Sequence, residues 1–184
     1  MVDVVLRTDP ALDAARLDLP GTRAARAHGD VAAPDPRRRH RATDVALRGA
    51  AASAAIERAV RALAADPDAR ASRAAVAEWL LDNAHVLREA RELLRHDLPP
   101  AFTRVLPRLD ERAGGRRRAD AIAIAVVAED DAPIDGPALD RFVDAYQRVA
   151  PLTTGELWAL PAFLRLALLE DLARVAGRHV PAAV

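Results

Sequence analysis

The sequence predicts an all-α fold, an irregular helical bundle of about five to six helices with a disordered N-terminal arm. From residue 43 onward, apolar side chains recur every three or four residues, which is the spacing of one face of an α-helix. Proline and glycine divide that pattern into pieces of helical length. We therefore expect a flexible Pro/Arg-rich arm over residues 1–42, a helical domain over 43–177 and a tail over 178–184.

The arm is expected to be mobile because prolines and glycines interrupt its short apolar fragments. A short helix is expected only near residues 11–17. The arm ends in a basic run at residues 37–41. We interpret this run as a solvated linker, and the alternative is a contact with an acidic membrane surface or nucleic acid.

Two helices are predicted next, over residues 43–65 and 72–96. Thr43 is a suitable N-cap for the first helix. In the second, Asn83 falls on the apolar stripe, where an amide without hydrogen-bond partners would cost about 1–3 kcal/mol. The stripes comprise Val45, Ala52, Ile56, Val60 and Leu63 in the first helix, and Val76, Leu80, Leu87, Ala90 and Leu94 in the second.

The opposite face of the second helix is acidic, with Glu78, Asp82 and His85 one turn apart. A carboxylate and an imidazole at i, i+3 can share a metal ion in a bundle, but such sites draw matching pairs from facing helices. The chain contains no E-x-x-H, and no second carboxylate–imidazole pair at this spacing. We therefore predict a solvated face with ion pairs and no metal, a metal site being the alternative.

The middle of the chain is predicted to be less regular. Residues 114–118, Gly-Gly-Arg-Arg-Arg, are expected to form a flexible connection. Residues 119–128 alternate like a strand at Ile122, Ile124 and Val126, but no partner strand can be identified, so we predict a helix. A short helix over 101–109, limited by Pro107, is expected to direct Phe102, Val105, Leu106 and Leu109 inward.

A penultimate helix is predicted before Pro151, with Asp135 as its cap and Pro137 near its first position. Its inward stripe comprises Leu139, Phe142, Val143, Tyr146 and Val149.

The last helix, expected between Pro151 and Gly177, is the predicted centre of the bundle because it is apolar around most of its surface. Thr153 and Glu156 stand at capping-box spacing, and Gly177 is placed for a left-handed C-cap. Pro161 is expected to kink the helix or displace its start.

The composition excludes several classes of function. The chain carries 27 basic and 27 acidic residues, and this balance argues against a nucleic-acid-binding protein, so no nucleic-acid partner is expected. There is no cysteine, which excludes disulfides and thiolate sites. Nucleophile-elbow, nucleotide-loop and H-E-x-x-H motifs are missing, so we predict no cofactor. The two Trp, one Tyr and three Phe lie on or beside apolar stripes, where we expect core positions rather than sugar-binding ones.

Two stretches resemble a known family. Glu-Trp-Leu-Leu-Asp-Asn at 78–83, followed by Arg-x-Asp-Leu-Pro at 95–99, is similar to a signature of cyclic β-1,2-glucan synthases. R-F-V-D-A-Y-Q-R-V-A-P-L-T-T-G-E-L-W-A-L-P at 141–161 and its continuation at 164–176 also resemble that family. The similarity extends over roughly residues 43–177.

Members of that family are large inner-membrane enzymes that build β-1,2-glucan rings from UDP-glucose. The resemblance places this chain with the helical region that precedes their transferase, whose nucleotide-sugar motifs the chain lacks. Family aromatics are missing at Ala84, and Thr154 replaces a usual isoleucine, which implies a divergent or truncated relative. The implied location is cytoplasmic, at most peripheral to the inner membrane.

The leading hypothesis is a non-catalytic accessory module that binds another protein or the membrane-bound remainder of a glucan synthase. One alternative is a small carbohydrate-active enzyme using Glu78 and Asp82 or Glu156, with glycan contact. Another is a regulatory module that binds anionic partners through the arginine runs 37–41 and 116–118. The candidate binding or interface residues are Glu78, Trp79, Asp82, Asn83, Glu156, Trp158 and Arg165.

Overall fold

The computed structural model describes residues 20–32, 43–65, 78–80, 82–110, 112, 115–129 and 134–179, and within them the chain is almost entirely helical. The predicted all-α class is therefore confirmed. The elements with assigned bounds are α2 Pro20–His28, β1 Val31–Ala32, α3 Thr43–Ala65, α6 Ala84–Asp97, α7 Pro100–Val105, β2 Arg108–Leu109, α8 Arg118–Val127, α9 Gly136–Gln147 and α10 Thr154–His179.

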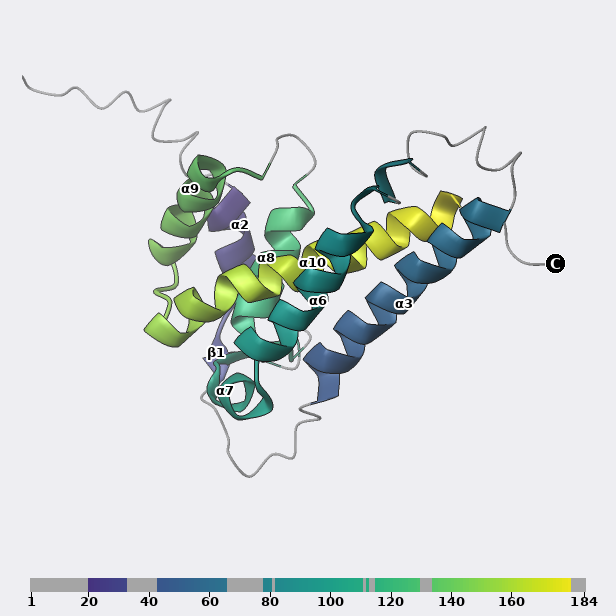
Figure 1. Cartoon of the computed structure of the whole chain (residues 1–184). Coiled ribbons are helices and arrows are strands. Elements are labelled where there is room, and N and C mark those ends of the chain that lie inside the picture. The colour runs from purple at the N-terminus through teal and green to yellow at the C-terminus, as the bar shows by residue number, and fades with distance from the viewer. Residues whose placement is uncertain are drawn as a thin grey trace, which may run out of the picture.

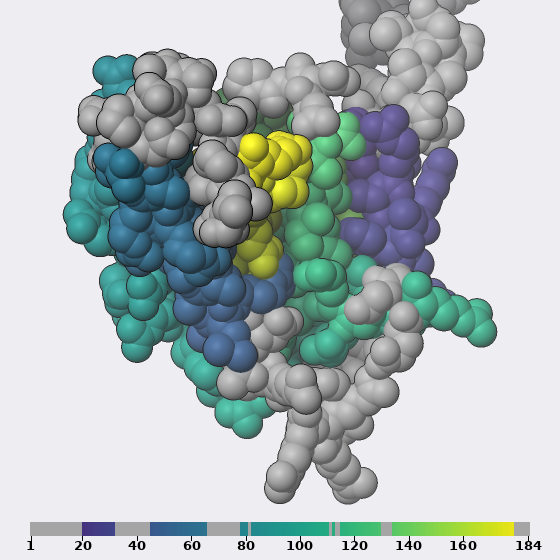
Figure 2. All heavy atoms as spheres, turned by 90° about the vertical axis from the view of Figure 1, so that its right-hand side faces the viewer, coloured from purple at the N-terminus to yellow at the C-terminus, as the bar shows by residue number. Residues whose placement is uncertain are grey.

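Helix α10 is the centre of the bundle, as its apolar sequence predicts. It packs against α3, α8 and α6, and Figure 1 shows these helices crossing or running beside it. In Figure 2 the yellow end of α10 lies between α3 in blue and α8 in green. Its buried residues include Leu160, Phe163, Leu166 and Leu169, which belong to the same hydrophobic core as Ile56, Leu63, Leu80 and Ile122.

The sequence predicted a cap at each end of α10, and the structure confirms only the first. The capping box is confirmed: the Thr153 backbone N–H donates to Glu156 Oε2 at 2.9 Å, and the Glu156 N–H donates to Thr153 Oγ1 at 3.3 Å. Pro161 lies inside the helix without ending it. The predicted C-cap at Gly177 is wrong, because α10 continues to His179 and Gly177 has no positive φ.

The segments expected to be irregular are partly ordered by packing. Residues 119–128 were predicted to be helical, and α8 confirms this, with Ile122 and Val126 buried. The inward direction predicted for Val105 is wrong, because α7 ends at this residue and leaves it exposed. Leu109 is buried, but as part of strand β2 rather than a helix.

The predicted flexible arm over 1–42 is wrong for residues 20–32, where the structure has a helix and a strand. Helix α2 packs against α9 and α8, and β1 pairs antiparallel with β2, with Val31 opposite Leu109. The helix can pack because Gly21 brings its backbone against the backbone of Phe142 and Tyr146. The predicted helix near residues 11–17 and the basic run at 37–41 lie outside the described residues.

Candidate functional site

A buried ion pair fixes the start of α10 to α8. The Arg118 guanidinium donates from Nε to Glu156 Oε1 at 2.7 Å and from Nη2 to Oε2 at 2.6 Å. The two side chains are 7% and 0% exposed. Because the hydrogen bonds that Arg118 donates to Glu156 outweigh the cost of burial, the pKa of Arg118 is raised above its usual value. Glu156 thus caps the helix and also forms a bidentate ion pair with Arg118.

A second pair of polar side chains lies beside this one. His28 Nδ1 and the Tyr146 hydroxyl share a hydrogen bond at 2.9 Å, which joins α2 to α9. Burial, together with the nearby charge of Arg118, lowers the pKa of His28. Burial raises the pKa of Tyr146 to about 12, although Arg118 opposes that shift. The imidazole is therefore favoured in its neutral form and the phenol in its protonated form.

A third polar cluster joins α3, α8 and α10. Arg48 contacts Asp120 Oδ2 at 2.6 Å from Nη1 and Glu170 Oε2 at 2.6 Å from Nη2. Arg116 approaches the same Asp120 carboxylate at 3.4 Å. Burial disfavours the Arg48 charge, but hydrogen bonds to Glu170 and Asp120 outweigh it and raise its pKa. Each charged side chain in this cluster has an oppositely charged partner within it, which is typical of charges that have a structural role.

The ion pairs of Glu156 and Glu170 fix α10 to α8 and α3. The outer face of the helix carries exposed apolar side chains. Trp158, two residues after Glu156, is 78% exposed. Leu157 and Leu168 are also exposed large apolar residues, and Pro161 lies one turn after Leu157 on the exposed side of the helix. We call Leu157, Trp158, Pro161 and Leu168 the α10 outer face. The expectation that all aromatic side chains are in the core is therefore wrong for Trp158.

The predicted site residues do not form one cluster. Arg165 donates from Nη1 to Asp97 Oδ2 at 2.9 Å, at the C-terminal end of α6. Glu78, Asp82 and Asn83 precede the other end of α6, about 20 Å away along a helix with 1.5 Å rise per residue. Because α6 runs antiparallel to α10 (Figure 1), Glu156 lies further still from residues 78–83.

Residues 78–83 make local contacts. Glu78 and Asp82 are exposed, and Trp79 is 50% exposed rather than in the core. The Asn83 amide donates to the Trp79 carbonyl at 2.8 Å. Asn83 is half-buried and lies in a turn just before α6, so the predicted continuous helix is interrupted there, and the amide contact to Trp79 is local.

The basic cluster at 116–118 is not the flexible anion-binding surface that the sequence suggests. Arg117 and Arg118 are buried. The Arg117 Nε–H donates to the Thr103 carbonyl at 2.5 Å, and Arg118 is held by Glu156. The regulatory hypothesis therefore loses this half of its proposed contact surface. Glu156, buried and paired, is likewise unavailable as the exposed carboxylate of the enzyme hypothesis.

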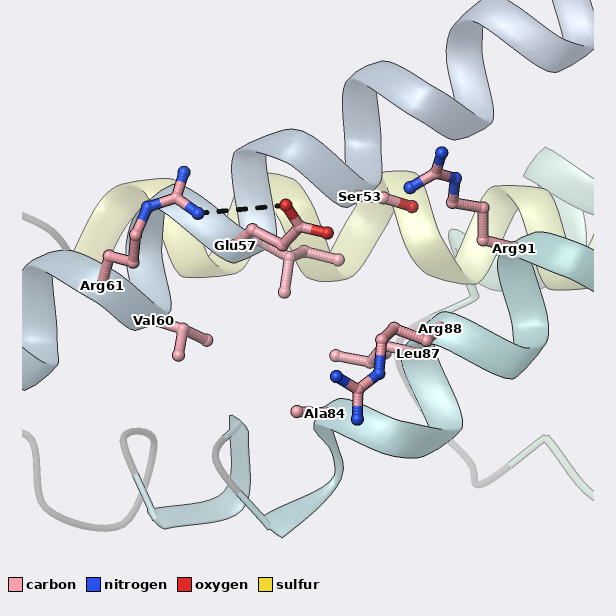
Figure 3. Close-up of a pocket in the computed structure, with 9 residues that line it drawn as sticks. Ser53, Glu57, Val60, Arg61, Ala84, Leu87, Arg88 and Arg91 are labelled. Carbon is pink, nitrogen blue, oxygen red and sulfur yellow. Dashed lines mark ion pairs between the residues drawn. The ribbon is translucent and has the colours of Figure 1, made fainter.

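A long groove lies between α3 and α6. One part, of about 200 Å³, is lined on the α3 side by Ser53, Ile56, Val60 and neighbours, and on the α6 side by Ala84, Leu87, Arg88 and Arg91. In Figure 3 the labelled α3 and α6 side chains face each other across this space. The second part adjoins it at Arg91 and follows the same two helices to Val45 and Leu98. Sequence reasoning missed this groove because its two walls are far apart in the chain.

The described residues contain no group of three or more His, Asp or Glu side chains close enough to hold a metal ion. Within the same residues, no helix combines the length and apolar character needed to cross a bilayer.

Comparison with known proteins links the chain to a glucan synthase. Over 123 residues, 67% of its length, the chain is 42% identical to the cyclic beta-(1,2)-glucan synthase NdvB of Rhizobium meliloti (strain 1021). The matched residues make up 4% of NdvB. No protein-family model matches the chain, and no solved structure does. The resemblance seen in the signature stretches is therefore confirmed as similarity to a small region of this relative.

Proposed function

We propose that this chain, which is similar to a small region of a cyclic β-1,2-glucan synthase, is a non-catalytic helical module that docks on a larger protein of that kind. The observation that carries the proposal is the exposure of Trp158, at 78%, on a helix start that is otherwise rigidly held. An exposed tryptophan on a fixed scaffold is typical of the centre of a protein interface.

The relative supports this assignment of a partner. The matched region is 4% of NdvB, so a module of this size accounts for only a small part of such a protein. Trp158 also lies inside the stretch 141–161, whose resemblance to glucan synthases extends through Leu-Trp-Ala-Leu-Pro. We infer that the α10 outer face packs against the remainder of a glucan-synthase-type protein.

The polar residues of the module favour a structural role over a catalytic one. Glu156, Asp120 and Glu170 each accept hydrogen bonds from an arginine. A carboxylate whose oxygens already accept hydrogen bonds from an arginine lacks free access to a substrate. The module therefore contributes a shape and a contact surface, and the chemistry belongs to its partner.

The test is a binding measurement against purified NdvB-type glucan synthase from which the matching region has been deleted. We expect saturable binding of the intact chain, and about thirtyfold weaker binding for Trp158→Ala. Leu47→Ala, which removes an exposed apolar side chain from α3, is the matched control and is expected to bind within about twofold of the unmodified chain.

Two results would overturn the proposal. One is binding that Trp158→Ala leaves unchanged, or no binding at all. The other is synthesis of glucan from UDP-glucose by the isolated chain. A titration with β-1,2-glucan oligosaccharides completes the test, because saturable sugar binding that requires Trp158 would assign the α10 outer face to a glycan instead.

A further inference from the structure

Helix α2 connects α9 to the rest of the molecule. Among the elements described, α2 is the only one that packs extensively against α9, and it also packs against α8. Figure 1 shows α2 in purple beside α9. On α9 the contact involves Phe142 and Tyr146, which are 8% and 0% exposed. Departure of α2 would therefore uncover two aromatic side chains.

Few apolar groups hold α2 in place. Apart from Pro20, its nine residues include no apolar side chain larger than alanine, and the buried ones are Gly21, Thr22 and Ala25. The stabilisation from burial scales with apolar area, so this contact contributes less than the leucine side chains that hold α10 in the core. Segments with few buried apolar contacts can open while the rest of a protein stays folded.

The remaining contacts of α2 and β1 are also small. Strand β1 pairs with β2 over two residues. The ion pair between Arg23 and Glu129 spans 3.5 Å, and its side chains are 58% and 42% exposed, so it contributes little. At the C-terminal end of α2, His28 Nδ1 lies 2.9 Å from the Tyr146 hydroxyl. This last contact is one that a proton can alter.

A proton on His28 weakens its contact with Tyr146. A neutral imidazole can accept a hydrogen bond from the phenol, whereas both nitrogens of an imidazolium are donors. The phenol keeps its own proton, because burial raises the pKa of Tyr146 to about 12. The charge of Arg118, at the start of α8, also disfavours a charged His28, and together with burial it lowers the pKa of that imidazole.

The acidic groups on the neighbouring helices are engaged elsewhere or face solvent. Both oxygens of Glu156, on α10, accept hydrogen bonds from Arg118. Both oxygens of Asp120, on α8, accept hydrogen bonds from Arg48. A positive charge on His28 is therefore poorly compensated in the closed form. The other charged side chains of α2 and of the α9 region are exposed: Arg23, Arg26, Asp140, Arg141, Asp144 and Arg148.

We propose that α2 is a strap that is released from α9 when His28 takes up a proton, while α3, α6, α8 and α10 stay folded. Release exposes Phe142 and Tyr146, so this aromatic surface of α9 is accessible only in the open form. The α10 outer face takes no part in the release, and the inference does not depend on the proposed function.

The direction of the pH effect follows from the two forms of His28. Its pKa is lowered in the closed form, and in the open form it returns to the ordinary value of about 6.5. The open form therefore takes up the proton first as pH falls, and release is favoured below that value. For a single proton, the ratio of open to closed molecules rises by at most about tenfold per pH unit.

Native-state hydrogen exchange at pH 7.5 and 5.5, corrected for intrinsic exchange rates, tests the proposal. A released helix of nine residues does not persist without packing, so its amides exchange. At pH 7.5 we expect the amides of residues 24–28 to be at least about tenfold less protected than those of residues 160–169 in α10. Their protection is expected to fall about three- to tenfold further at pH 5.5.

The single tyrosine provides a second readout. Labelling with 3-fluorotyrosine gives one ¹⁹F signal, and exchange measurements on it detect a minor form in which Tyr146 is exposed. The population of that form is expected to rise about three- to tenfold between pH 7.5 and 5.5, in parallel with exchange in α2.

His28→Gln keeps a neutral side chain that can bond to the phenol, and it is expected to abolish the pH dependence of exchange in α2. The matched control His85→Gln replaces an exposed histidine of α6 and is expected to retain that dependence. Trp158→Ala is also expected to retain it, so failure of this inference and failure of the proposed function can be told apart.

Three results would overturn the proposal. One is equal protection of α2 and α10, since α2 would then open only on global unfolding. Another is exchange in α2 that does not change between the two pH values, or a Tyr146 signal without a minor form. These results require only the unmodified protein. The third is a pH dependence that persists in His28→Gln, which would assign the titration to another group.

Discussion

Arg118 and Glu156 meet through two hydrogen bonds of 2.7 and 2.6 Å across 38 positions of sequence, and almost no part of either side chain reaches solvent. Arg118 is the first residue of α8 and Glu156 lies in the first turn of α10. The pair therefore joins the starts of two core helices. Arg118 Nη2 also donates to the Pro151 carbonyl at 2.9 Å, so the chain entering α10 is held as well.

Removal of one partner of this pair is expected to be strongly destabilising. Arg118→Met leaves the Glu156 carboxylate buried without its counter-charge, at a cost of about 3–5 kcal/mol in the free energy of unfolding measured with urea. The double variant Arg118→Met/Glu156→Met is expected to be more stable than Arg118→Met alone, because it removes the buried charge. Equal stability of the two variants would contradict this account.

Arg48→Lys is expected to destabilise the protein by about 2 kcal/mol although it preserves the charge. The Arg48 guanidinium donates to both Asp120 and Glu170, whereas an ammonium cannot present the same planar fork to two carboxylates. Urea denaturation measures the effect. Arg58→Lys on the exposed side of α3 is the control and is expected to change stability by less than about 0.5 kcal/mol.

Acidification is expected to destabilise the fold partly through His28. Its pKa is lowered in the folded protein, chiefly by burial and then by the charge of Arg118, so the unfolded chain takes up a proton first as pH falls. The stability held by neutral His28 is therefore complete above its ordinary pKa of about 6.5 and is lost as pH falls below that value. Denaturation at pH 7.5 and 5.5 should show a smaller loss for His28→Gln than for the unmodified protein. Equal losses would mean that His28 titrates alike in both states.

Two glycine-to-alanine substitutions are expected to act in opposite directions. At Gly21 a Cβ atom would lie 2.1 Å from the Phe142 carbonyl oxygen, a backbone atom that cannot move without separating α2 from α9, so Gly21→Ala should cost about 1–3 kcal/mol. At Gly177 nothing lies within 4 Å of the added Cβ. Gly177→Ala should therefore stabilise α10 by up to about 1 kcal/mol. Thermal denaturation measures the stability of both variants. A Gly21→Ala variant as stable as the unmodified protein would show that α2 does not pack as described.

Much of the fold could be predicted because its signals are local. The Thr153–Glu156 cap, the Asp135 cap and the helix over 119–128 each depend on a few neighbouring residues. Local signals gave wrong predictions where contacts between distant segments determine whether a residue is ordered or buried. Residues 20–32 contain breakers but are ordered by contact with α9 and β2, and Trp158 lies in an apolar stretch whose opposite side faces the core.

By itself, the sequence determined the all-α class, the approximate limits of most helices, the central position of α10 and the resemblance to glucan synthases. Only the tertiary structure decided which arginines are buried in ion pairs and which face solvent beside the groove. Arg118 and Arg88 have the same side chain, and their roles differ because Arg118 meets a carboxylate from a distant helix while Arg88 meets none among the residues that the structure describes. Burial of a charge depends on such long-range partners, and the spacing of residues along one helix does not specify them.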